Sequence, residues 1–98
     1  MSSTKHQNTK PLFPLGLLLA TPAALERMAR HGINGFELVA RHVHGDWGDI
    51  SPEDAKENEF SVNRHLRIFS SYGHGDERIW VITEADRSAT TLLCPEDY

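Results

Sequence analysis

Three segments in the first two thirds of the chain repeat their apolar residues at the three- and four-residue spacing of an amphipathic helix. Each begins with a residue type that caps helices, namely Thr21, Asn34 and Ser51, and proline follows the first and third of these caps. The pattern predicts helices from Pro22 to about His31, from Asn34 to near Gly45 and from Ser51 to about Arg64. The residues expected to face inward on the first two helices are Ala24, Leu25, Met28, Ala29, Phe36, Val39, Ala40 and Val43.

After Leu66 the apolar residues alternate with a period of two, in segments rich in β-branched and aromatic side chains. Strands are predicted at 67–72, 78–84 and 89–93, and the short turns between them predict a three-stranded antiparallel meander. One sheet face is expected to carry Phe69, Trp80, Ile82 and Leu92, and the other Ile68, Tyr72, Ile79, Val81 and Leu93. Since both faces are apolar, one face has to pack under the helices, while the other is partly covered or is an interface.

A further apolar run from Leu15 to Ala20 predicts a short, largely buried strand before the first helix. The element order is then β-α-α-α-β-β-β. This is an α+β fold in which the helical N-terminal half packs on the C-terminal meander, joined by the N-terminal strand. Residues 1–14 are expected to form a disordered polar leader, and residues 15–98 a single α+β domain, because 98 residues can bury only one modest core.

Composition narrows the classes of function. A formal net charge of −4 with dispersed basic residues disfavours binding to a nucleic-acid backbone. Cys94 is the only cysteine, which excludes an internal disulfide and points to the cytoplasm as a reducing compartment. No apolar run approaches the ~20 residues of a membrane helix, so no membrane association is expected. Nor is a cofactor expected.

The segment 41–49 concentrates two imidazoles, two carboxylates and an indole. His42 and His44 lie two residues apart at the end of a helix, where they would point about 200° away from each other, so a metal site is not predicted. A purely structural interpretation has Gly45 end the helix, has the following residues form a turn, and has Trp47 fill the space between the second helix and the sheet.

A catalytic interpretation of the same segment stays open. A helical half followed by an antiparallel meander resembles the architecture of barnase- and colicin-like ribonuclease toxins, although no motif matches and architecture alone assigns no activity. In this interpretation the protein is a metal-independent ribonuclease. His42 is the general base or acid, Arg67 binds the phosphate, and Thr83 and Thr91 are supporting donors on one sheet face.

A binding interpretation places the function on two loops, which would present charged and aromatic side chains in fixed directions. The segment 84–88 is a charged hairpin tip, and 45–49 is the loop that contains Trp47. The residues expected to contact a partner are Asp46, Trp47, Asp49, Glu84, Asp86 and Arg87.

Residues 15–98 resemble a family of short bacterial proteins carried on plasmids and integrative elements, often labelled "plasmid-related protein". The segments that carry the resemblance are 20–22, 40–43, 45–49, Asn58, 67–68, 71–72, 80–88, Thr91 and 95–98. Members are also labelled as the modification subunit of type I restriction systems. That label disagrees with the residues, because the chain has neither a glycine-rich cofactor loop nor an Asn-Pro-Pro-aromatic motif.

The resemblance implies an accessory protein of a mobile element. With no activated nucleophile and no convincing metal set, we expect a non-enzymatic protein that binds a host or element protein and inhibits or modulates host defence, of the anti-restriction or anti-CRISPR type. Self-association as a homodimer through the sheet is a further expectation. The ribonuclease toxin, acting on RNA, is the alternative.

Overall fold

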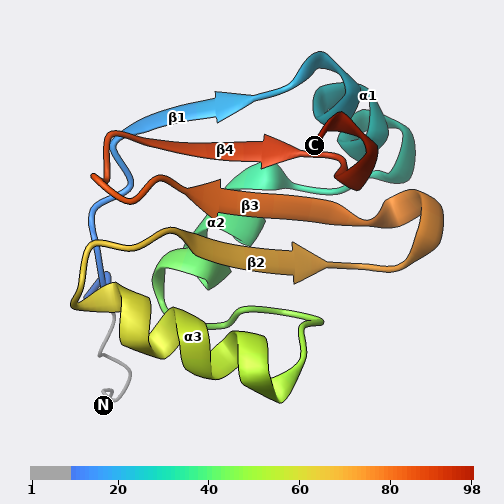
Figure 1. The fold of residues 1–98 in the computed structure, drawn as a ribbon. Coiled ribbons are helices and arrows are strands. Elements are labelled where there is room, and N and C mark those ends of the chain that lie inside the picture. The colour runs from blue at the N-terminus through green and yellow to red at the C-terminus, as the bar shows by residue number, and fades with distance from the viewer. Residues whose placement is uncertain (1–9) are drawn as a thin grey trace, which may run out of the picture.

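The computed structural model describes residues 10–98 and has the expected order of elements (Figure 1). The helices are α1 (Pro22–His31), α2 (Gly35–Val43) and α3 (Pro52–Val62). The strands are β1 (Leu17–Ala20), β2 (Ile68–Tyr72), β3 (Ile79–Thr83) and β4 (Ala89–Leu93), and two 3-10 turns are η2 (Gly75–Glu77) and η3 (Pro95–Asp97). Among the described residues, no helix is long and apolar enough to cross a membrane.

The three helices begin at the predicted caps. The side-chain oxygens of Thr21 and Ser51 each accept a hydrogen bond from the backbone N–H three residues on, at 3.1 Å, and Asn34 accepts one from Phe36 at 3.0 Å. Gly32 ends α1 in the left-handed conformation, with φ 65°. Local sequence therefore accounts for where these helices start.

The strands form one four-stranded mixed sheet in the order β1-β4-β3-β2. The predicted meander is present, since β2, β3 and β4 pair antiparallel with their neighbours. The sheet has a fourth member, because β1 pairs parallel with β4. The prediction that this first strand is largely buried is wrong: β1 is an edge strand, and Leu17, Leu18 and Leu19 are exposed.

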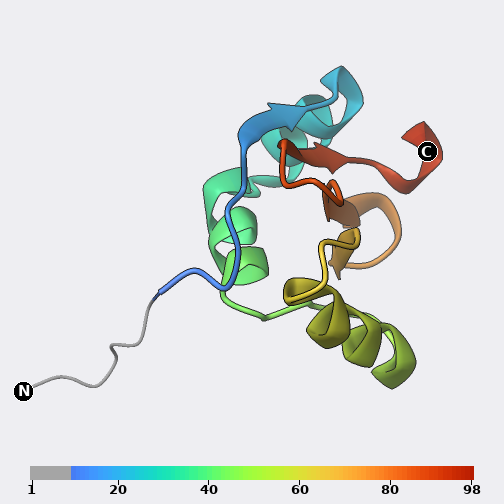
Figure 2. The same cartoon turned by 60° about the vertical axis from the view of Figure 1, so that its left-hand side comes forward.

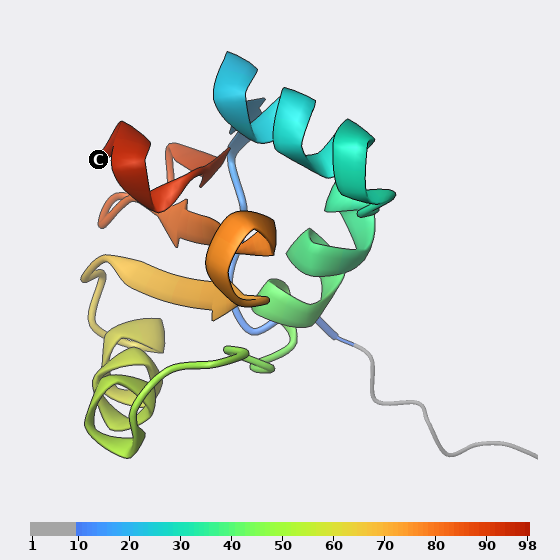
Figure 3. The same ribbon diagram turned by 90° about the vertical axis from the view of Figure 1, so that its right-hand side faces the viewer.

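The two faces of the sheet are covered differently. Helices α1 and α2 lie on one face, as Figures 2 and 3 show, and α3 runs along β2 at the edge far from β1 (Figure 1). The opposite face is covered in part by η3 and Tyr98. There the Trp80 ring meets the rings of Phe69 and Tyr98 at centroid distances of 5.0 and 5.9 Å.

The predicted faces hold for β2 and β3 but not for the end of β4. Leu92 pairs with Val81 and packs in the core under α1 and α2, whereas Leu93 pairs with Trp80 on the opposite face. Because side chains alternate along a strand, a difference of one residue in the assumed register exchanges the two leucines.

The folded domain begins before residue 15. The backbone N–H of Leu12 donates to the Val43 carbonyl at 2.8 Å, and Phe13 is buried in a second core cluster with Val43, Trp47 and Ile68. The disordered leader predicted for residues 1–14 therefore does not extend over Leu12 and Phe13, because the apolar segment 11–15 places the Phe13 ring in the core. Residues 1–9 lie outside the described residues.

Candidate functional site

The loop that contains Trp47 closes the outer edge of β2. The Trp47 carbonyl accepts from the Ser71 N–H at 3.1 Å, and the Asp49 N–H donates to the Ser71 carbonyl at 2.6 Å. Gly48, with φ 79°, lies so close that an added Cβ would come within 2.2 Å of the Ser71 carbonyl oxygen. Further along β2, the Asn58 side chain donates to the Phe69 carbonyl and accepts from its N–H, at 2.6 and 3.1 Å. This edge of the sheet is thus fully hydrogen-bonded.

The side chains of the same loop are engaged within the domain. Trp47 is buried, stacks on Phe13 and donates to Glu59 at 3.2 Å. Asp46 is exposed but pairs with Arg41 at 2.7 Å, and this hydrogen bond to the guanidinium lowers the pKa of Asp46. Asp49, also exposed, accepts from the Gly73 N–H at 3.1 Å. These contacts agree with the structural interpretation, in which the loop forms a turn and Trp47 fills the space between α2 and the sheet.

The hairpin tip is divided between exposed acids and a buried base. Asp86 is exposed and caps the turn through the Ser88 N–H at 3.0 Å, and Glu84 lies 3.5 Å from Arg67. Arg87 is buried, and its guanidinium donates to backbone carbonyls, among them Ser61 at 2.7 Å and Leu66 at 2.8 Å. Arg87 therefore joins the end of α3 to the hairpin by hydrogen bonds, and its guanidinium does not lie on the surface where a partner could contact it.

The two predicted binding loops do not form one surface. The first loop lies beside Ser71, near the end of β2, whereas Arg87 contacts Leu66, which precedes the start of β2. Of the six residues expected to contact a partner, Trp47 and Arg87 are buried, and Asp46, Asp49, Glu84 and Asp86 retain exposure at separate places.

His42 lies at the centre of a buried polar chain of four side chains. Its Nδ1 is 2.6 Å from the Ser70 hydroxyl, and its Nε2 is 2.9 Å from the Thr83 hydroxyl. Thr83 in turn lies 2.7 Å from the hydroxyl of Thr90, which donates to the Leu15 carbonyl at 2.8 Å. All four side chains are fully buried, and the chain connects α2 to β2, β3, β4 and the segment before β1.

The hydrogen-bond donors and acceptors of this chain are determined by its last member. The one proton of the Thr90 hydroxyl goes to the Leu15 carbonyl, so Thr83 must donate to Thr90 and accept from His42 Nε2–H. Nδ1 of His42 is then the acceptor for Ser70. His42 is thus a neutral imidazole with every polar atom satisfied, and burial lowers its pKa from 6.5 to about 4.

This buried imidazole predicts a loss of stability in mild acid. Between pH 6.5 and about 4 the unfolded chain binds a proton at His42 that the folded domain excludes, so stability falls as pH falls through this range. The difference between the two pKa values corresponds to a loss of about 3 kcal/mol by pH 4. Urea unfolding at pH 7.0 and near pH 4.5 measures the effect. Carboxyls with lowered pKa, such as Asp46, lose their contribution to the free energy of unfolding only at lower pH, so they do not account for a loss in this range. A His42→Asn variant should lack most of this dependence of stability on pH. Equal stability of the wild type at both pH values would contradict the assignment of His42 as a neutral, buried imidazole.

The four residues of the ribonuclease interpretation are not brought together. His42 and Thr83 are in contact, but both are buried and on the helical side of the sheet. Arg67 is directed to the Tyr98 hydroxyl and Glu84, and Thr91 follows Thr90 on β4 and so points to the opposite face. A neutral, enclosed imidazole separated from the arginine by the sheet has no access to a phosphate diester.

The two histidines of the segment 41–49 also diverge, as expected at a helix end. His42 points into the core, whereas His44 is exposed and its Nδ1 lies 2.7 Å from the Ala40 carbonyl. Within residues 10–98, no three histidine, cysteine, aspartate or glutamate side chains are grouped so that they could hold a metal ion.

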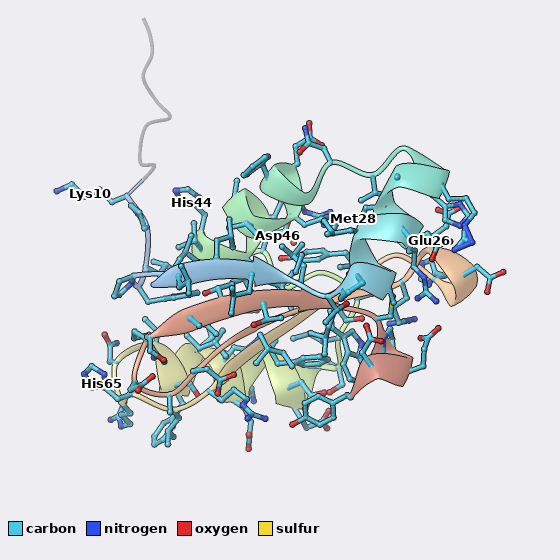
Figure 4. All side chains as sticks on the ribbon, turned by 90° about the horizontal axis from the view of Figure 1, so that it is seen from above. Lys10, Glu26, Met28, His44, Asp46 and His65 are labelled. Atoms are coloured by element: carbon cyan, nitrogen blue, oxygen red, sulfur yellow. The ribbon has the colours of Figure 1, made fainter. Side chains whose placement is uncertain are left out.

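An apolar groove lies between β1, α1 and α2 on the helical face of the sheet. Its volume is about 460 Å³, and its lining residues are Leu18, Leu19, Ala20, Leu25, Met28, Ala29, Ile33, Asn34, Gly35, Phe36 and Leu92. Figure 4, which views the sheet from above, shows Met28 between the two helices and the strands. Leu25 and Phe36 remain 56% and 77% exposed at its sides.

These groove residues were assigned to the core by their helical spacing. Leu25 and Phe36 extend the apolar stripes of α1 and α2 beyond what the sheet covers, and the buried residues of α1 are Ala24, Arg27 and Met28. Gly35 allows the start of α2 to approach α1, since an added Cβ would lie 3.1 Å from Met28 Sδ. The sequence indicated this surface through the width of the apolar stripes on α1 and α2, which exceeds what a narrow sheet can bury.

Comparison of the chain with protein-family models, with curated proteins and with solved structures finds no match.

Proposed function

We propose that this chain is a non-enzymatic binding protein of a mobile element, which acts in the cytoplasm by holding apolar side chains of a host or element protein in the groove between β1, α1 and α2. The single observation that carries the proposal is the exposure of Leu25 and Phe36 on either side of a groove of about 460 Å³. Apolar groups gathered at an unpartnered concave surface are typical of protein interaction sites.

The chemistry of the groove favours a protein over a small ligand. Small-molecule sites combine apolar walls with a few polar groups that orient the ligand. Among the lining side chains only Asn34 is polar, and its Oδ1 is already engaged by the Phe36 N–H. Met28 at the floor is a flexible, polarisable side chain that adapts to different apolar partners.

The setting of the proposal comes from the resemblance to plasmid and integrative-element proteins. A small protein carried by such an element gains most from acting on the host's restriction or CRISPR machinery, so we assign the partner to that class. The ribonuclease alternative is not carried forward, because His42 is enclosed and Arg67 lies on the other side of the sheet.

Substitutions in the groove are expected to abolish the effect on host defence. Leu25→Glu and Phe36→Glu place a carboxylate in the apolar contact, and each should reduce partner capture at least tenfold while leaving folding intact, since both positions are exposed. The readouts are stoichiometric co-purification from a restriction-proficient host and the transformation efficiency of unmodified plasmid DNA.

Matched controls exist on the far side of the domain. Leu66 and Phe60 are a leucine and a phenylalanine like the two groove positions, and they are 47% and 53% exposed. Leu66→Glu and Phe60→Glu should therefore behave as wild type. Capture that survives both groove substitutions, or wild-type protein without effect on transformation, would count against the proposal. Cleavage of RNA by the purified protein would restore the enzymatic alternative.

A further inference from the structure

The two edges of the sheet differ in hydrogen bonding: the edge at β2 is paired, whereas the edge at β1 is open. The outer edge of β2 is occupied by the loop 47–49 and by the Asn58 side chain. Strand β1 forms the other edge, and within residues 10–98 no strand pairs with its outer side. Leu17 and Thr21 direct their N–H groups to β4, at 2.9 and 3.0 Å. By alternation, the N–H and C=O groups of Leu18 and Ala20 point outward.

This open edge lacks the features that normally prevent strand addition. Natural edge strands carry charged residues, proline or a bulge. Residues Leu17–Ala20 contain none of these side chains, and their three leucines are 65%, 39% and 44% exposed. Four unpaired backbone groups therefore point outward in the plane of the sheet, and the exposed leucine side chains flank them, Leu17 and Leu19 on one face and Leu18 on the other.

We infer that β1 pairs antiparallel with β1 of a second copy of this chain, about a two-fold axis at Leu19. The two four-stranded sheets then form one continuous eight-stranded sheet. A second copy is favoured over another protein because β1 carries no charge that would need an opposite charge, and because its apolar edge is complementary to itself.

The register follows from the geometry of the edge. Directly opposite residues in an antiparallel pair point to the same face, so the axis has to pass through a residue and not between two. The central residues of the edge, Leu18 and Leu19, are the two candidates. An axis at Leu19 places Leu18 of each copy opposite Ala20 of the other copy. The outward N–H and C=O groups of both residues are then hydrogen-bonded in each strand. An axis at Leu18 would pair Ala20 with Gly16, whose φ of 67° departs from strand geometry. The axis at Leu19 is therefore the one that we assign.

The interface is small. The exposed parts of Leu17, Leu18 and Leu19 amount to a few hundred Å² in each copy, against about 800 Å² per partner for a standard interface. We therefore expect a reversible dimer whose population rises with protein concentration.

The dimer has a consequence for the groove. A two-fold axis perpendicular to the sheet keeps both helical faces on the same side, so the two grooves lie on either side of the axis. A partner could then occupy both at once, which raises its apparent affinity without any new contact. The dimer does not depend on the proposed function, but this consequence rests on it.

Site-specific oxidation of the purified full chain tests the register. In the assigned pairing the two Leu19 residues face each other as a non-hydrogen-bonded pair with Cα atoms about 4.5 Å apart, within the range of a disulfide. Leu17 is the more exposed residue but lies opposite Thr21. Leu19→Cys should therefore form a covalent dimer at least tenfold faster than Leu17→Cys. Native Cys94 is buried and serves as background in both variants. Equal rates, or faster cross-linking of Leu17→Cys, would overturn the register.

Sedimentation equilibrium over a wide concentration range tests the dimer itself. The wild-type chain should shift from monomer to dimer. Leu19→Lys, which places two like charges on the axis, should remain monomeric, and Leu66→Lys, a position of similar exposure away from β1, should dimerise as wild type. Amide exchange at Leu18 and Ala20 should slow as concentration rises. A monomeric wild type, or protection of these amides at every concentration, would overturn the inference. No partner protein enters these experiments, so their failure leaves the groove tests unaffected.

Discussion

His42→Ala is expected to lower the free energy of unfolding by about 4 kcal/mol, a large part of the stability of a domain of this size. His42 is fully buried, and its removal leaves a cavity beside the Phe13 and Trp47 rings, whose centroids lie 5.3 and 6.0 Å from that of the imidazole. It also removes the acceptor of the buried Ser70 hydroxyl and the donor to Thr83, although Thr83 still donates to Thr90.

Urea unfolding followed by tryptophan fluorescence measures this loss, because Trp47 is itself in the core. His44→Ala, at the exposed C-cap position of α2, removes a hydrogen bond to the Ala40 carbonyl and should cost less than about 1 kcal/mol. If His42→Ala does not fold, Thr83→Val removes one hydroxyl at nearly constant volume and should cost about 1 to 3 kcal/mol. A loss below 1 kcal/mol in His42→Ala would show that the buried chain contributes little.

Arg87→Ala is expected to have the second largest effect, a loss of about 3 kcal/mol. Its guanidinium donates to the carbonyl of Ser61 in the last turn of α3 and to the carbonyls of Leu66 and of the hairpin. A cation at the C-terminal end of a helix also interacts favourably with the helix dipole. Removal of the side chain leaves these carbonyls without their donor and loosens the C-terminal end of α3, while Asn58 still joins the middle of the helix to β2.

Arg87→Lys should recover less than half of the loss, because a single ammonium group cannot reproduce the planar fork that reaches several carbonyls. Arg64→Ala removes an exposed arginine at the same end of α3 and should be nearly neutral. Thermal unfolding and amide exchange of α3 report both effects. Unchanged exchange in α3 of Arg87→Ala would contradict the capping role of this arginine.

The same residues illustrate why the candidate site was only partly predictable. Glu84, Asp86 and Arg87 lie in one charged tip, but the local sequence does not reveal that Arg87 finds carbonyl acceptors more than twenty residues away and becomes buried. Likewise, His42, Arg67, Thr83 and Thr91 were expected to converge on one sheet face, but only His42 and Thr83 are in contact, and Phe13 and Trp47 from two other segments pack against His42. Leu25 and Phe36 carried the clearest signal of the groove, yet helical spacing alone does not distinguish a residue in the core from one beside a groove.

Helix positions, strand positions and the meander were determined by the sequence itself, because caps, prolines and hydrophobic period act within a few residues of each other. Thr21, Asn34 and Ser51 cap the helices wherever those helices pack. Which sheet edge stays open was decided only by tertiary structure. The loop 47–49 and Asn58 close the edge at β2, while β1 joins the sheet beside β4 and leaves its own edge unpaired. These contacts join residues far apart in the chain, so signals that act within a few residues cannot specify them.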